Sequence, residues 1–121
     1  MSTFLLALAS ILISVAAQFT FKVGARQLAA ASAAAEGSLA SLAQSVASNP
    51  WVLGGFLLYG IGAVIWLSVL ARWDVSKAYP LVGFGFVITL AVGWMAGEML
   101  TPLRVAGALC ICLGVGLIAQ S

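Results

Sequence analysis

An apolar stretch near the start of the sequence, TFLLALASILISVAAQFTFKV (residues 3–23), decides the fold class. A helix needs about 20 residues to cross the hydrocarbon core of a bilayer, and this stretch is long enough. Only helices and closed barrels satisfy the backbone in lipid, and the apolar residues run continuously instead of alternating as in a barrel strand. The stretch therefore predicts a transmembrane helix. Three similar runs follow, at Trp51–Ala71, Ala78–Gly97 and Pro102–Ala119.

These four runs predict a single all-α membrane domain of four transmembrane helices over residues 1–121. The first run could alternatively be a signal peptide cut near SVAAQ. No Lys or Arg precedes it, however, and its polar residues continue past the supposed cut. We therefore expect the first run to remain in the membrane as a helix.

The composition excludes several function classes. Charged residues make up 7% of the chain, whereas a soluble domain has about 25%. The net charge of +2 is too small and too scattered to indicate a nucleic-acid partner. The chain has no His and no CxxC, HExxH, Walker or GxSxG pattern, and its acidic residues Glu36, Asp74 and Glu98 lie near apparent loop boundaries. We therefore expect a membrane protein that is not an enzyme, without catalytic residues, metal or other cofactor.

A polar stripe runs along the first helix. Ser10, Ser14, Gln18, Lys22 and Arg26 recur every four residues, and a step of four advances only about 40° around a helix. The serines could bond to their own backbone, and the two cations could reach the headgroups. A Gln within a span normally faces a polar cavity or a partner. The alternative interpretation is that the stripe forms one wall of a groove. The two cations of the stripe would then attract an anionic head group.

Aromatic residues of the next two helices could line the same groove. Tyr59 and Trp66 are seven residues apart and can share a helix face, and Tyr79 lies where the third helix begins. Such faces suit sugar rings or prenyl chains, although an aromatic belt at the membrane interface is the alternative. We expect a substrate site formed by Ser14, Gln18, Lys22, Arg26, Tyr59, Trp66 and Tyr79.

The segment between the first two spans is rich in Ala and Ser. Within it Leu39, Leu42 and Val46 fall at helical spacing, with polar residues on the other faces. This pattern predicts a short amphipathic helix at about residues 38–48 lying on the membrane surface, with a mobile linker as the alternative. Further along the chain, Thr101 is suited to cap a helix that begins with Pro102.

Small residues indicate where helices approach one another closely. Gly93 and Gly97 have GxxxG spacing, and Ala106, Cys110 and Gly114 form a row on the fourth helix. Four helices enclose little space for a polar solute, so we expect a dimer that uses at least one of these rows. Packing within one chain is the alternative. Cys110 and Cys112 point to different sides of a helix, so we expect neither a disulfide nor a metal clip.

Two motifs resemble a known superfamily. The four helices with SKAYPLVGFGFV (residues 76–87) and GEMLTPLRVAGALCICLGVGLI (97–118) resemble four-helix members of the drug/metabolite transporters. Small multidrug-resistance exporters of this kind carry an essential Glu eight residues before a Lys. Here Ser14 holds that position, so the proton-and-cation site is missing. The stretch SVAAQFTFK (14–22) instead resembles the ArnE/ArnF subunits, which are proposed to flip undecaprenyl-phosphate-aminoarabinose. The extended first loop favours the ArnF member.

This resemblance implies a small flippase subunit in the bacterial inner membrane, acting as a homodimer or with a similar small subunit. Its substrate would be an anionic lipid, a polyprenyl-phosphate-linked sugar. Lys22, with Arg26, would hold the phosphate, Ser14 and Gln18 would line the path, and the aromatic residues would contact sugar or prenyl chain. Two alternatives remain open. One is a small multidrug or quaternary-cation exporter using Glu98, and the other is a non-transporting accessory subunit of a lipid-linked glycosyltransferase system.

Overall fold

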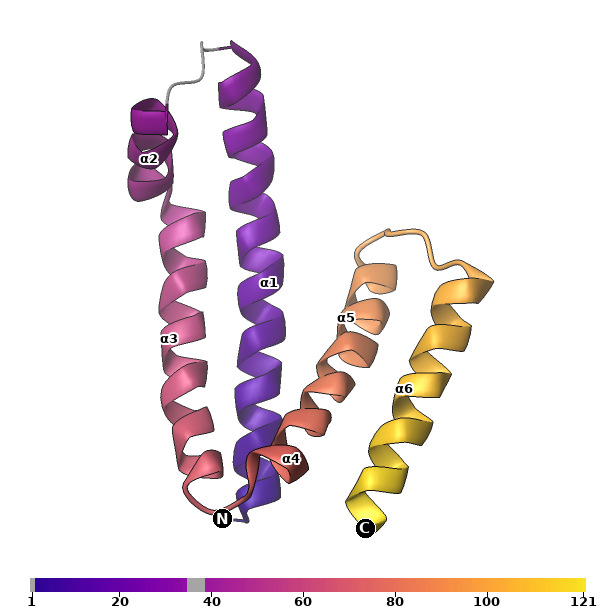
Figure 1. Ribbon diagram of the computed structural model, residues 1–121. Helices are drawn as coiled ribbons and strands as arrows, with labels where there is room; N and C mark the ends of the chain where they lie inside the picture. The colour runs from indigo at the N-terminus through magenta and orange to yellow at the C-terminus, as the bar shows by residue number, and fades with distance from the viewer. Residues whose placement is uncertain (1, 35–38) are drawn as a thin grey trace.

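The computed structural model describes residues 2–34 and 39–121, and Figure 1 shows their arrangement. Within these residues the chain is helical and contains no strand, which confirms the predicted all-α class. The elements in order are α1 (Thr3–Ala34), α2 (Leu39–Ser48), α3 (Pro50–Leu70), α4 (Val75–Ala78), the 3₁₀ helix η1 (Tyr79–Val82), α5 (Gly83–Met95) and α6 (Pro102–Gln120).

Four parts of the described chain are long and apolar enough to cross a membrane. They are Thr3–Ala30, Pro50–Leu70, Val75–Met95 and Pro102–Gln120. The third span, Val75–Met95, is divided into α4, η1 and α5, with Pro80 in the 3₁₀ turn. Proline removes a backbone donor and its ring crowds the preceding turn, which explains the change of helix type. The first helix continues past Val23, where the apolar run ends, to Ala34.

Two helices begin with a side-chain cap followed by proline. The Thr101 hydroxyl accepts a hydrogen bond from the Arg104 amide at 3.2 Å, which confirms the predicted cap before Pro102. Asn49 does the same for α3, where its Oδ1 accepts from the Trp51 and Val52 amides at 2.9 and 3.2 Å. The signal for this second cap is the pair Asn49 and Pro50, a residue type that favours the N-cap followed by one that favours the first helical position.

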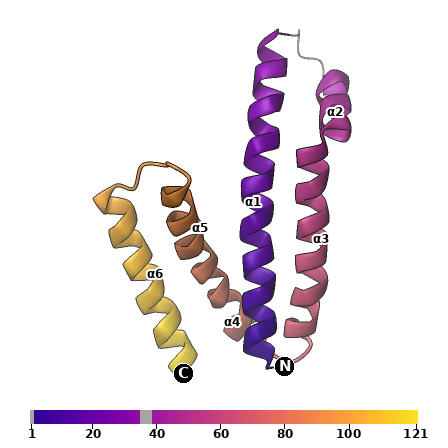
Figure 2. The ribbon, with the colours of Figure 1, turned by 180° about the vertical axis from the view of Figure 1, so that it is seen from behind.

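The helices form two hairpins, visible from both sides in Figures 1 and 2. α1 and α3 lie side by side along most of their length, while α5 and α6 form a second hairpin that meets α1 towards the end where both termini lie. A small core fills this meeting point. It contains Ala7, Ile11, Val69, Ala78, Leu81 and Val115.

Glycines allow the close contact between α1 and α3. A Cβ atom at Gly24 would lie 2.6 Å from Val52 Cγ2, and one at Gly55 would lie 2.6 Å from Phe21 Cδ1. The Phe21 ring is itself held edge-on against Phe56, with ring centroids 4.9 Å apart. Small residues at such positions let two membrane helices approach. Their backbones are therefore fixed in rotation as well as in distance.

The outer helices keep much of their apolar surface uncovered within the single chain. On α6, Leu103, Leu113 and Leu117 are 82%, 70% and 70% exposed. Such a surface suits lipid or another protein chain. The helix α2 contributes no buried residue, and Leu39 is 84% exposed. Its predicted first residue, 38, lies outside the described residues, and its position on the membrane surface stays a prediction.

Substituting Gly55 with Ala tests the α1–α3 contact. The new methyl group would overlap the Phe21 ring, so we expect the free energy of unfolding to fall by about 1–3 kcal/mol. Gly60→Ala on the same helix is the matched control, because a Cβ there meets no atom within 4 Å. The measurement is the temperature at which detergent-solubilised protein loses its monodisperse peak. Equal midpoints for the two variants would contradict the contact.

Candidate functional site

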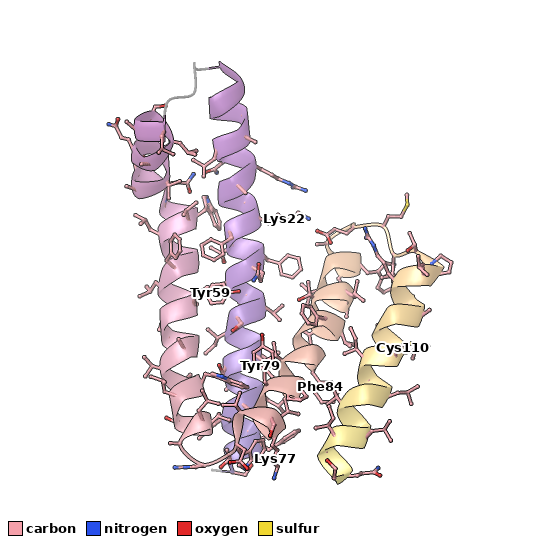
Figure 3. All side chains as sticks on the ribbon, viewed as in Figure 1. Lys22, Tyr59, Lys77, Tyr79, Phe84 and Cys110 are labelled. Carbon is pink, nitrogen blue, oxygen red and sulfur yellow. The ribbon has the colours of Figure 1, made fainter. Side chains whose placement is uncertain are left out.

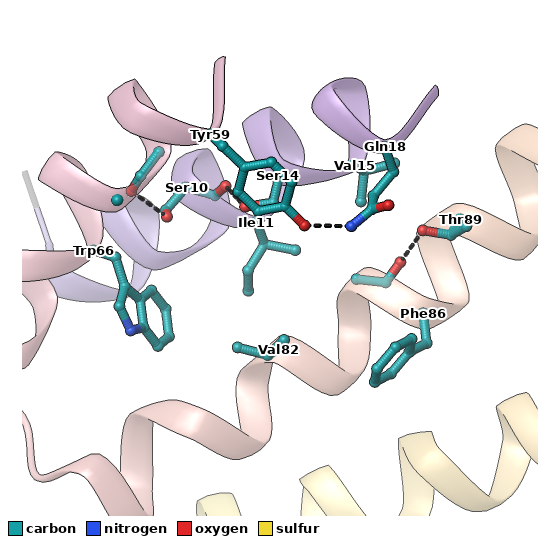
Figure 4. A pocket seen from close by; sticks show the side chains of 13 residues that line it. Ser10, Ile11, Ser14, Val15, Gln18, Tyr59, Trp66, Val82, Phe86 and Thr89 are labelled. Atoms are coloured by element: carbon teal, nitrogen blue, oxygen red, sulfur yellow. Dashed lines mark hydrogen bonds between the residues drawn. The ribbon is translucent and has the colours of Figure 1, made fainter. Parts of the chain in front are cut away.

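A pocket of about 430 Å³ lies between α1, α3 and the third span, as Figure 4 shows. This volume is within the usual range for small-molecule sites. Its lining is mostly apolar, with a few hydroxyl and amide groups and no charged side chain. The lining residues are Ser10, Ile11, Ser14, Val15 and Gln18 of α1, Tyr59, Gly62, Ala63 and Trp66 of α3, and Val82, Gly85, Phe86 and Thr89 of the third span.

The two serines of the polar stripe differ in role. Ser10 is buried, and its hydroxyl donates to the Gly62 carbonyl of α3 at 2.8 Å. The Ser14 hydroxyl donates to the Ser10 carbonyl of its own helix at 3.0 Å. Ser10 therefore joins the two helices, whereas Ser14 presents an oxygen to the pocket that can still accept a hydrogen bond.

The predicted stripe and the predicted aromatic face meet at Gln18 and Tyr59. Gln18 Nε2 donates a hydrogen bond to the Tyr59 hydroxyl. The Tyr59 ring stacks on Phe21 with centroids 5.6 Å apart, which limits its rotation. Trp66 lies about two helical turns further along α3 and lines the same pocket. The structure thus brings together Ser14, Gln18, Tyr59 and Trp66.

Lys22 lies just beyond this pocket and has an acidic partner from a distant part of the chain. It is one turn after Gln18, a rise of about 6 Å along α1. Its ammonium forms an ion pair with the Glu98 carboxylate, and the two side chains are 36% and 39% exposed. Glu98 belongs to the connection between α5 and α6, far from Lys22 in the sequence, so no local pattern could reveal the contact.

The end of α5 has the hydrogen bonds of a Schellman motif, which places Glu98. The Gly97 and Glu98 amides donate to the Trp94 and Gly93 carbonyls at 3.1 and 2.8 Å. Gly97 has φ of 94°, a conformation that favours glycine. Gly93 leaves room for the carboxylate, because a Cβ there would lie 2.5 Å from Glu98 Oε2. Gly93 and Gly97 therefore do not form the expected helical GxxxG face, since α5 ends at Met95.

Besides Lys22, two of the predicted site residues do not line the pocket. Arg26 is exposed on α1 beyond Lys22. Tyr79 is 66% exposed in η1, and Figure 3 shows it towards the Lys77 end of the molecule, away from Lys22. The third span instead contributes Phe86 and other lining residues. No local pattern in the sequence indicates which face of this span turns towards the stripe.

The predicted row of small residues on α6 is open in the single chain. Ala106 and Cys110 are exposed, and a Cβ at Gly114 would meet no atom within 4 Å. The opposite side of α6 packs on α5, where Ile111 Cγ2 would lie 2.9 Å from a Cβ at Gly83. Contact of the open row with a partner chain stays a prediction.

Comparison with known proteins gives a consistent group of relatives. The first is an ArnE subunit from Pseudomonas aeruginosa strain LESB58, 36% identical over 74 residues, or 60% of this chain and 64% of the relative. The second is from Serratia proteamaculans, 39% identical over 66 residues, or 54% and 57%. A third, from Erwinia tasmaniensis, is 35% identical over 71 residues, or 58% and 66%. Over these segments the chain is similar to ArnE flippase subunits.

Each of these relatives is named a probable 4-amino-4-deoxy-L-arabinose-phosphoundecaprenol flippase subunit, a transporter and not an enzyme. The matches span less than two thirds of the length of the relatives. All three carry the name ArnE, whereas the first loop predicted a likeness to the ArnF member. No family model and no solved structure matches the chain. Its apolar helices and its bacterial relatives place it in the inner membrane as a multi-pass protein.

Replacing Ser10 with Ala tests the link between α1 and α3 inside the pocket wall. We expect the free energy of unfolding to fall by about 0.6–1.5 kcal/mol, since a buried interhelical hydrogen bond is lost. Ser14→Ala removes only a bond within one helix, so it should change stability by about 0.5 kcal/mol or less. Unfolding in a graded SDS and detergent mixture, followed by circular dichroism, measures both. A larger loss for Ser14→Ala would contradict these roles.

Proposed function

We propose that this chain is a subunit of a flippase that moves a polyprenyl-phosphate-linked sugar, such as 4-amino-4-deoxy-L-arabinose-phosphoundecaprenol, across the bacterial inner membrane. The names of its relatives support this substrate class. The observation that carries the proposal is the position of Lys22, one turn beyond the pocket at the Gln18–Tyr59 hydrogen bond. A sugar phosphate needs a positive charge for its phosphate and a neutral, aromatic surface for its ring. Lys22 beside the pocket provides this combination.

The pocket suits a sugar ring. Tyr59 and Trp66 offer aromatic surface, while Gln18 and Ser14 offer hydrogen-bonding groups without charge. Phe86 at its edge is 61% exposed and Tyr59 is 37% exposed, so the pocket is open to its surroundings. A prenyl chain could therefore stay in lipid while the head group occupies the pocket. This arrangement lowers the desolvation cost, because the neutral polar groups replace part of the hydration of the sugar.

Lys22 would bind the phosphate. An ammonium at the edge of a membrane span forms charge-assisted hydrogen bonds with phosphate oxygens. Arg26, exposed one turn further along α1, adds a second positive charge that attracts the lipid from the membrane surface. The exposed position of Tyr79 leaves it outside the pocket, so the proposal assigns the sugar contacts to Tyr59 and Trp66.

The proposal includes a dimer, either with a second copy or with a similar small subunit. The resemblance to the paired ArnE/ArnF subunits supports it. The open row of Ala106, Cys110 and Gly114 on α6 offers a surface for such a partner. A cation exporter that uses Glu98 is less well supported, since a lone cation bound to this carboxylate would leave its partner Lys22 without a counter-charge.

The experiment that tests the proposal replaces Lys22. We expect Lys22→Ala to slow transport about tenfold or more, since one charge-assisted contact is lost, and Lys22→Arg to keep part of the activity. Transport is measured in proteoliposomes that contain the chain alone or with a similar subunit. The readout is the exposure of the substrate amine to a reagent that does not cross the membrane.

Arg26→Ala serves as the control, because it removes a charge of the same sign one turn further from the pocket than Lys22. We expect it to reduce transport much less than Lys22→Ala. Unchanged transport by Lys22→Ala, at equal amounts of reconstituted protein, would remove Lys22 from the mechanism. Activity only with a second subunit present would show that the dimer is heteromeric.

A further inference from the structure

Glu98 places a negative charge at the C-terminal end of α5, a position that does not stabilise the helix. A negative charge at the C-terminal end of a helix is unfavourable, because the last carbonyl groups already carry partial negative charge. Yet two glycines hold Glu98 there, one by its positive φ and the other by leaving space for the carboxylate. The carboxylate meets Lys22 of α1 at the edge of the pocket. These observations indicate that the Lys22–Glu98 pair has a role other than stabilising the helix, such as binding a ligand.

We propose that Glu98 binds the ammonium group of a zwitterionic head group while Lys22 binds its phosphate, so that Glu98 selects amino-sugar lipids. This inference rests on the proposed function and deepens it. The two side chains are about one-third exposed, so water and ligand can reach both. A partly exposed ion pair contributes little to stability by itself, and a ligand that offers each partner an opposite charge can replace it.

The charge balance explains how this arrangement would discriminate between lipids. A head group with both phosphate and ammonium exchanges one ion pair for two, and no charge remains unpaired. A lipid with phosphate alone draws Lys22 away and leaves the Glu98 carboxylate beside the phosphate. Like charges at such a distance repel, so Glu98 would reject the lipid that lacks an amine. If Glu98 repels lipids without an amine, its removal should strengthen their binding. A purely structural role for Glu98 does not predict this gain.

Among the described residues, no other acidic side chain lies where it could bind the ammonium group beside Lys22. Among residues 2–34 and 39–121 the acidic side chains are Asp74 and Glu98. Asp74 directly precedes α4, on the connection between α3 and the third span, which Figure 1 places at the end near the termini. Glu98 follows α5 at the opposite end of that span. The pocket lining itself contains no charged residue.

The test compares two lipids that differ in one charge. The probes are undecaprenyl-phosphate-linked 4-amino-4-deoxy-L-arabinose and the same lipid with its amine acetylated. Binding to the purified full chain is measured by native mass spectrometry across a concentration series. We expect the wild-type protein to prefer the free amine about tenfold, the size of one charge-assisted hydrogen bond.

Glu98→Gln should change the two affinities in opposite directions. It should weaken binding of the free amine and strengthen binding of the acetylated lipid, so that the preference falls close to one. Asp74→Asn is the matched control and should keep the wild-type preference. An equal loss of both affinities in Glu98→Gln would mean that the carboxylate only supports the fold, and this would overturn the inference.

A second variant keeps the test valid if Glu98→Gln does not fold. Gly93→Ala retains the charge but displaces the carboxylate, since its Cβ would meet Glu98 Oε2. We expect it to reduce the preference for the amine, and an unchanged preference would contradict the inference. Equal wild-type binding of both lipids would overturn the role of Glu98 and leave the proposed function intact. Binding of neither lipid would overturn both.

Discussion

The contact between α1 and α3 is the constraint on which the site depends. A stripe of residues every four positions forms a pocket wall only if its helix is fixed in rotation. Gly24 and Gly55 let the two backbones meet, and the buried hydrogen bond from Ser10 to the Gly62 carbonyl fixes the register. Gln18 is thereby turned towards Tyr59 and the third span. The same contact that holds the hairpin together thus creates the polar face of the pocket.

The second constraint is the ion pair that joins the two hairpins. The hairpin of α5 and α6 meets α1 through α5, mainly near the termini, where the small core lies. Towards the other end, Lys22 and Glu98 connect α1 to the turn between α5 and α6. An ion pair that is partly exposed gives less stability than packing. The pocket therefore lies between a packed end and an end held by exchangeable charges, and a charged ligand can act on the second without disturbing the first.

The sequence predicted the features that depend on composition and local chemistry. Four apolar runs predicted the helical membrane domain, and Thr101 with Pro102 predicted a helix start, because hydropathy and capping act over a few residues. The Lys22–Glu98 contact could not be predicted in this way, since it depends on how two hairpins pack. Gly97 was misread for a related reason. Its spacing from Gly93 fits a helix, but its positive φ ends one.

The pocket lining is uncharged, and the charged residues Lys22 and Glu98 lie at its edge. This arrangement suits a head group that is neutral overall. A sugar joined to a prenyl chain by phosphate carries one negative charge there, and a protonated amine on the ring balances it. Moving a lone charge through an apolar region is far more costly than moving a balanced pair with hydrogen-bonded partners. A pocket with neutral lining can therefore accept such a head group, while Lys22 and Glu98 provide matching charges at one membrane face. In an antiparallel dimer, the partner chain would provide the same pair at the other face.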